Sequence, residues 1–191
     1  MKNLIFIFLL ISHNSGAATK LSLKTTAGNS QFSAIGNPSA IRITGSGEGP
    51  EGDLSLREKG DQIFFSGQLK INLNSYDTGI GLRDRHMKEK YLEVGQFGNA
   101  TLNLNEIPVP KVALSQTGET KMPFSATLDL HGVQKPVQGE FTIVPDGAAV
   151  KIYAQFKLKL SDHNIKIPSF AGVTVADHVE VNANSRAEIV K

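Results

Sequence analysis

The densest group of chemically active side chains in this 191-residue sequence is Asp77, Arg83, Asp84 and His86. A carboxylate beside a histidine is a pair that acid–base catalysis uses, and either group can also bind a metal ion. Asp84 and His86 are two positions apart, however, and side chains at that spacing do not face each other on a helix. The spacing therefore argues against a His–Asp relay in this segment.

The remaining chemical inventory points away from catalysis and metal binding. The sequence has no cysteine, which excludes disulfides, thiolate nucleophiles and cysteine-bound metals. There is no nucleophile elbow and no phosphate-binding P-loop, and the glycine-rich stretch at 45–50 has no lysine–hydroxyl pair. The histidines, none at a metal-ligand spacing, are His13, His86, His131, His163 and His178. We therefore predict a non-enzymatic protein with no catalytic residue, no metal site and no cofactor, and a hydrolase built on Asp84 and His86 is the weakest alternative.

Composition and charge indicate an ordinary globular protein. Hydrophobic residues make up 40% and charged residues 20% of the chain, which is enough for one domain with its own core. Lys and Arg number 20 against 18 Asp and Glu, so the formal net charge is +2 and no basic run occurs. Because nucleic-acid binding needs a concentrated basic surface, we expect no nucleic-acid partner.

The first 18 residues have the features of a secretory signal peptide. Lys2 precedes an apolar run at 4–11, and small residues follow up to Ala18. A membrane-spanning helix needs about 20 apolar residues, so this run is too short to be one. We expect a signal peptide at 1–18 and a mature chain of 19–191 without a transmembrane segment. That chain would be exported to the periplasm or, alternatively, secreted.

From position 20 onward the hydrophobic pattern has a period of two, which is typical of half-buried β-strands. Tight turns are indicated between strands at 58–61 and 145–147, where Gly follows or precedes Asp. The long alternating segments are 63–73, 122–130, 137–143, 150–160 and 179–189, and the shorter ones are 21–23, 41–43, 54–56 and 102–104. Strands at this spacing predict an all-β antiparallel sandwich or barrel. The number of strands favours a single closed barrel of about eight.

One segment breaks the alternation. Residues 82–92 are rich in helix-forming side chains and predict one short helix inserted between strands. The inward positions of the strands are aliphatic and phenylalanine-rich, but small residues occur among them at Gly67, Ala126, Gly139, Ala154 and Ala183. An eight-stranded barrel is either filled by side chains or holds one small ligand. On periodicity alone, both a filled core and a cavity fit these small residues.

Two motifs resemble those of the YceI family of exported bacterial proteins. One is Asp77-Thr78-Gly79 followed by Arg-Asp-Arg-His-Met at 83–87, and the other is the run Phe-Ser-Ala-Thr-Leu-Asp-Leu-His-Gly-Val at 124–133. The segment Asp-His-Val-Glu-Val at 177–181 is similar to the family's final strand. The resemblance implies a lipocalin-like barrel over 19–191. It also implies a long apolar tunnel that binds a polyisoprenoid, an isoprenoid quinone or a similar lipid for transport or storage.

If the resemblance holds, one face of the long strands should contact the lipid. The predicted ligand-binding residues on these strands are Ile63, Phe65, Leu69, Ile71, Phe124, Leu128, Phe141, Ile143, Ile152, Phe156, Val179 and Val181. Arg83, Asp84 and His86 either meet a polar head group at the tunnel mouth or fix the helix against the barrel. The alternative for the strand residues is a dry, packed core.

A second class of function stays open at this point. A β-sandwich module that recognises carbohydrate or a protein partner through its loops would have the same alternating strands. The absence of Trp and the presence of only 3 Tyr argue against a sugar-stacking surface. A homodimer is also compatible with the sequence.

Overall fold

The computed structural model describes residues 19–23, 27–38, 41–115, 117–170 and 172–190, and the predicted signal peptide at 1–18 lies outside them. The strands are β1 (Lys20–Leu23), β2 (Gly28–Asn37), β3 (Ile41–Glu48), β4 (Gly52–Lys59), β5 (Gln62–Asn72), β6 (Asn99–Pro110), β7 (Thr120–Leu130), β8 (Val133–Asp146), β9 (Ala149–Lys159), β10 (Ser169–Phe170) and β11 (Val173–Val190). The helical elements are η2 (Leu73–Ser75), α1 (Gly81–Arg85), η3 (His86–Tyr91), η4 (Lys111–Leu114) and η5 (Ser161–His163). None of the helices among these residues is long and apolar enough to cross a membrane.

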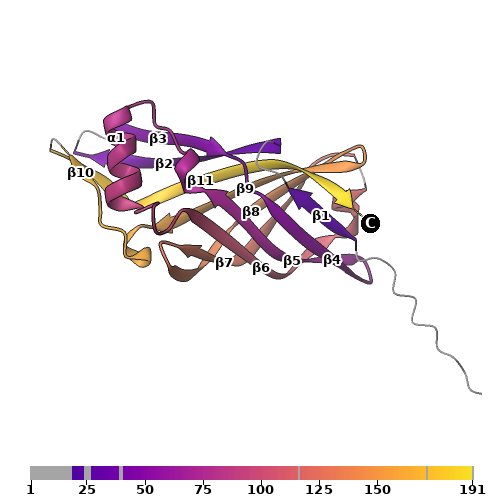
Figure 1. Ribbon diagram of the computed structural model, residues 1–191. Helices are drawn as coiled ribbons and strands as arrows, with labels where there is room; N and C mark the ends of the chain where they lie inside the picture. The colour runs from indigo at the N-terminus through magenta and orange to yellow at the C-terminus, as the bar shows by residue number, and fades with distance from the viewer. Residues whose placement is uncertain (1–18, 24–26, 39–40, 116, 171, 191) are drawn as a thin grey trace, which may run out of the picture.

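Eight strands close into a barrel. Their order is β1-β4-β5-β6-β7-β8-β9-β11, and β1 pairs with β11 to complete the ring. Every pairing around the ring is antiparallel. The prediction of a closed antiparallel barrel of about eight strands is confirmed. The β-sandwich alternative is wrong, because the sheet closes on itself instead of splitting into two (Figure 1).

A hairpin extends the barrel wall at one end. One edge of β11 pairs first with β2, from Thr174 to Ser185, and then with β1, from Glu188 to Val190. β3 pairs with β2 and continues the sheet outward. On its other side β3 is joined to the rest of the chain by backbone hydrogen bonds between Ser46 and Asp77. The segment after Asp77 therefore follows the free edge of β3 into the helix.

The helix covers this end of the barrel, opposite the end where the C-terminus lies (Figure 1). α1 and η3 are continuous over 81–91 and are here termed the capping helix. The predicted short helix near 82–92 is confirmed. The first half has α-helical and the second half π-helical hydrogen bonding, a rare, wider form that is frequent at functional sites.

At the end opposite the capping helix the barrel is packed solid. Large side chains that are almost completely buried there come from β1, β4, β5, β6, β8 and β9: Leu21, Leu54, Phe65, Val109, Ile143 and Val150. The hairpin turns of β4–β5 and β8–β9 close this half, which is termed the packed end. It is the filled core that one of the two sequence interpretations expected.

Candidate ligand-binding site

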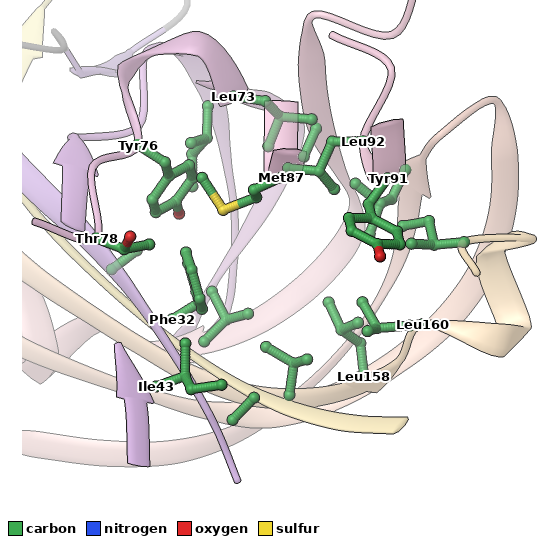
Figure 2. A pocket seen from close by; sticks show the side chains of 18 of the residues that line it. Phe32, Ile43, Leu73, Tyr76, Thr78, Met87, Tyr91, Leu92, Leu158 and Leu160 are labelled. Carbon is green, nitrogen blue, oxygen red and sulfur yellow. The ribbon is translucent and has the colours of Figure 1, made fainter. Parts of the chain in front are cut away.

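The half of the barrel under the capping helix is hollow. It encloses a cavity of about 490 Å³, which lies within the range of about 300–1,000 Å³ that is typical of small-molecule sites. Its lining is almost entirely apolar, with polar side chains at a few positions such as Tyr76, Thr78 and Arg83. Figure 2 shows the roof of this cavity, where Met87 and Tyr91 of the capping helix face Phe32, Ile43 and Leu158 of the strands.

The cavity wall is made by the halves of several strands that lie at one end of the barrel. The late residues of β5 (Leu69, Ile71) and the early residues of β6 (Ala100, Leu102) border the cavity, whereas Phe65 and Val109 do not. Because β5 and β6 run antiparallel, these halves lie at the same end of the barrel. The same division holds along β7, β9 and β11. One barrel thus combines a packed end with a hollow end.

A phenylalanine cluster lies where the two halves meet. Phe124 stacks on Phe141 with ring centroids 4.0 Å apart, and it meets Phe156 edge-on at 6.3 Å. Phe141 and Phe156 border the cavity, while Phe124 lies behind them. Stacked and edge-to-face aromatic pairs are favourable and stiff, so this cluster forms a well-defined floor.

Ten of the fifteen predicted ligand-binding residues border the cavity. They are Leu69, Ile71, Leu128, Phe141, Ile152, Phe156, Val179, Val181, Arg83 and His86. Four others, Ile63, Phe65, Phe124 and Ile143, are buried side chains that do not border it. The fifth, Asp84, is hydrogen-bonded to Thr78 and does not border the cavity either.

The small inward residues divide in the same way. Ala154 and Ala183 border the cavity, whereas Ala126, Gly67 and Gly139 do not. At Gly67, with φ at +153°, a Cβ would come 2.3 Å from the carbonyl oxygen of Asp53. Glycine is therefore needed there for close packing of the backbone, and not to leave room for a ligand.

Several cavity residues lie outside the predicted set. Met87, Tyr91 and Leu92 come from the capping helix and its end, Tyr76 follows η2, and Phe32 comes from β2. The roof lacks the alternating pattern on which the lining was predicted, so periodicity could not identify it. Leu158 and Leu160 did have that signal, because the alternation of the strand predicted at 150–160 includes both positions.

Thr78 ties the start of the capping helix to the loop before it. Its backbone N–H and its hydroxyl donate to Oδ1 of Asp84, at 2.9 and 2.6 Å. Arg83 in turn donates from Nε to the Thr78 hydroxyl and from Nη2 to the Thr78 carbonyl, both at 2.7 Å. The Asp-Thr-Gly and Arg-Asp motifs thus form one hydrogen-bond network, here termed the Thr78 network. Arg83 borders the cavity and Asp84 does not.

The Thr78 network lowers the pKa of Asp84. Partial burial acts to raise the pKa of Asp84, but the hydrogen bonds from the Thr78 side chain and backbone outweigh it, so the pKa is lowered. The charge of Lys88 acts in the same direction. Asp84 is therefore a carboxylate at neutral pH and lies in the first turn of the helix, where a negative charge is favourable.

We predict that Asp84→Asn lowers the free energy of unfolding by about 1–2 kcal/mol at pH 7, since it weakens two charge-assisted hydrogen bonds. The folded-state pKa is depressed, so this contribution is present above the unfolded pKa of about 3.9 and is lost as pH falls through the folded value. Urea unfolding from neutral pH down to acid measures it. Glu89→Gln on the same helix is the control, expected within about 0.5 kcal/mol of wild type. An Asp84→Asn effect that is absent at pH 7, or that grows in acid, would contradict the assignment.

The far end of the capping helix is held by a histidine. Nε2 of His131 lies 2.8 Å from Oε2 of Glu93, and its ring packs on Phe97 with centroids 4.4 Å apart. The other ring nitrogen lies 3.3 Å from the carbonyl oxygen of His163, which is itself buried. These contacts join the chain after the helix to the β7–β8 turn, so the roof is fixed at both ends.

Tyr76, which lines the cavity, has a buried hydroxyl group. Burial raises the pKa of Tyr76, and a hydrogen bond with the side chain of Ser30 opposes the change. The ring of Phe32 packs against Tyr76 at 5.4 Å in an edge-on arrangement. The hydroxyl is therefore neutral, so it adds no charge to the apolar wall.

The chain is similar to known proteins over most of its length. A family model described as a YceI-like domain matches residues 21–187. Proteins named YceI from Salmonella arizonae and Salmonella newport are 32% identical over 104 residues, which is 51% of this chain. The match covers about half the length of these relatives.

Two solved structures share the fold. A polyisoprenoid-binding domain from Saccharophagus degradans superposes with a TM-score of 0.65 at 23% identity, covering 89% of this chain and 98% of that domain. BcnA of Burkholderia cenocepacia superposes with a TM-score of 0.61 at 17% identity, covering 85% of this chain and 96% of its own. At these identities the likeness concerns the barrel architecture.

Proposed function

This chain belongs to the YceI-like family, and on that premise we propose that it binds a polyisoprenoid, an isoprenoid quinone or a similar long apolar lipid in its barrel cavity. The observation that carries the proposal is the apolar cavity of about 490 Å³. Each methylene group moved from water into such a site contributes about 0.8 kcal/mol, so the tail supplies most of the affinity. The fold shared with a polyisoprenoid-binding domain supports the same ligand class.

The ligand would lie with its tail toward the phenylalanine floor and its polar end toward Arg83 and His86. Both side chains border the cavity, as does Thr78, to which Arg83 is hydrogen-bonded. A guanidinium has five N–H donors, and two of those of Arg83 are used by Thr78. In this proposal Arg83 orients a carbonyl, hydroxyl or phosphate head group while holding the helix in place.

A binding role needs no catalytic group, and the chemistry of the cavity fits one. The carboxylate of Asp84 is engaged by Thr78, and the Tyr76 hydroxyl is neutral. We propose that the protein carries or stores its lipid without transforming it. We further propose that the chain is exported to the periplasm, as its first 18 residues indicate.

Titration of the delipidated protein with isoprenoid quinones of increasing tail length tests the ligand class. Affinity should rise with each added isoprene unit until the cavity is full, and the same quinone head without a tail should bind far more weakly. Isothermal calorimetry should show a negative heat-capacity change, the signature of apolar burial. Equal affinity for the tailed and tail-less quinones would contradict the proposal.

A further inference from the structure

Exposed apolar side chains gather where the cavity reaches the surface. Among the described residues, Ile41, Ile80 and Leu82 are 51%, 53% and 49% exposed, and all three border the cavity. They come from β3, from the loop that follows Thr78 and from the capping helix. This group is termed the mouth. The other large apolar residues of comparable exposure, Val112, Tyr153 and Val190, do not border the cavity.

Basic side chains of the capping helix lie beside the mouth. Residues 77–93 contain four basic and four acidic side chains, and three of the acids are engaged by neighbours: Asp77 by the N–H of Gly79, Asp84 by Thr78 and Glu93 by His131. The fourth acid, Glu89, is exposed. Arg85 and Lys90 are exposed. An apolar patch flanked by exposed cations matches the interface of an anionic lipid bilayer, where apolar side chains insert below the head groups and cations stay among them.

We propose that the mouth docks on the surface of an anionic lipid bilayer, with Ile41, Ile80 and Leu82 inserted among the acyl chains, so that ligand passes directly between membrane and cavity. This inference rests on the proposed function. A long isoprenoid is nearly insoluble in water, and transfer through the mouth keeps its tail in an apolar environment throughout. The same three side chains form the rim of the cavity and the inserted surface, so the two apolar regions are continuous.

Vesicle flotation tests the docking. Wild-type protein should float with vesicles of equimolar phosphatidylglycerol and phosphatidylcholine, and should bind less to pure phosphatidylcholine or at high salt. The double variant Ile80→Asp/Leu82→Asp should lose at least about ten-fold in vesicle affinity. Val112→Asp/Tyr153→Asp is the matched control and should float like wild type, since these equally exposed residues lie away from the mouth.

A second pair of variants tests the charge. Arg85→Glu/Lys90→Glu reverses two charges beside the mouth and should lose binding to the anionic vesicles by about ten-fold. Lys59→Glu/Lys121→Glu makes the same change in net charge at the packed end and should bind several times better than the first pair. Equal losses in both pairs would show non-specific attraction and overturn the proposal.

The remaining outcomes are also decisive. No flotation of the wild type, or equal flotation of the mouth variant and its control, overturns the docking. A dimer in sedimentation equilibrium that the mouth variant abolishes would assign the surface to a second copy of this chain and overturn it as well. Binding of an isoprenoid quinone delivered from cyclodextrin separates the two proposals. If the wild type binds the quinone but not the vesicles, only the docking fails, and if it does not bind the quinone, the proposed function fails.

Discussion

An Ala154→Phe variant is expected to lose about 100-fold or more in affinity for an isoprenoid quinone while remaining folded. Ala154 lies on β9 and borders the cavity, so the added ring enters space that the ligand tail would occupy. Displacing about four methylene groups at 0.8 kcal/mol each removes about 3 kcal/mol, which corresponds to a factor of about 200. Because the ring fills a void, the free energy of unfolding should change by less than about 1 kcal/mol.

Ala126→Phe is the matched control for this substitution. Ala126 is also a small inward residue, on β7, but it is 7% exposed and does not border the cavity. The added ring has no space there, so overpacking should cost about 1–3 kcal/mol of stability. Urea unfolding and quinone titration of both variants measure the contrast. If Ala154→Phe binds the quinone like wild type, the tail does not occupy this cavity.

The second large effect concerns the packed end. Leu54→Ala is expected to lower the free energy of unfolding by about 4 kcal/mol, and Leu128→Ala by about 2 kcal/mol. The two leucines are equally buried, at 2% and 3% exposure, but only Leu128 borders the cavity. Truncation of Leu54 leaves a new void among tightly packed neighbours. Leu128 already faces empty space on one side and loses fewer contacts.

Chemical denaturation of the two leucine variants without ligand, compared at the same pH and temperature, gives the difference directly. Saturating quinone should then widen the gap between wild type and Leu128→Ala, since a ligand stabilises the folded state in proportion to its affinity and the variant loses contacts with the tail. Equal losses of stability in the two variants would mean that the barrel is packed to the same degree at both ends.

Strand periodicity and the number of strands together predicted the closed barrel but not the full length of its strands. On β6 the alternation was recognised only at Leu102 and Leu104, although the strand runs from Asn99 to Pro110. Ile107 and Val109 are also buried, but at odd-numbered positions. Glu106, with φ at +54°, lies in a bulge that shifts the register between β5 and β6. A bulge inverts the phase of a strand, and a search for continuous alternation stops there.

β2 was missed for a different reason. Its inward positions are Ser30, Phe32, Ala34 and Gly36, of which only Phe32 is a large hydrophobic residue. Ser30 is completely buried, and its hydroxyl is satisfied by donating to the carbonyl oxygen of Glu48, at 2.6 Å. A strand with small or internally bonded inward residues has almost no hydrophobic period. Its pairing with β11 determines its structure, and that pairing is not visible in a local segment.

The lining of the site could be predicted only in part. Inward positions such as Phe156 and Phe65 have the same alternating signal, yet the first borders the cavity and the second fills the packed end. What separates them is their height along the barrel, which depends on register and on the position of the capping helix. The Thr78 network likewise depends on the tertiary structure, so its hydrogen bonds could not be predicted, although the sequence showed its residues as one group.

The most direct test of lipid binding is native mass spectrometry of the protein purified without detergent from the periplasm of an expressing bacterium. We predict a non-covalent adduct that extracts into organic solvent and has the mass and retention of an isoprenoid. The Ala154→Phe variant should lose this adduct. A wild-type protein that shows only its own mass, both as purified and after incubation with isoprenoid quinones, would contradict lipid binding in the cavity.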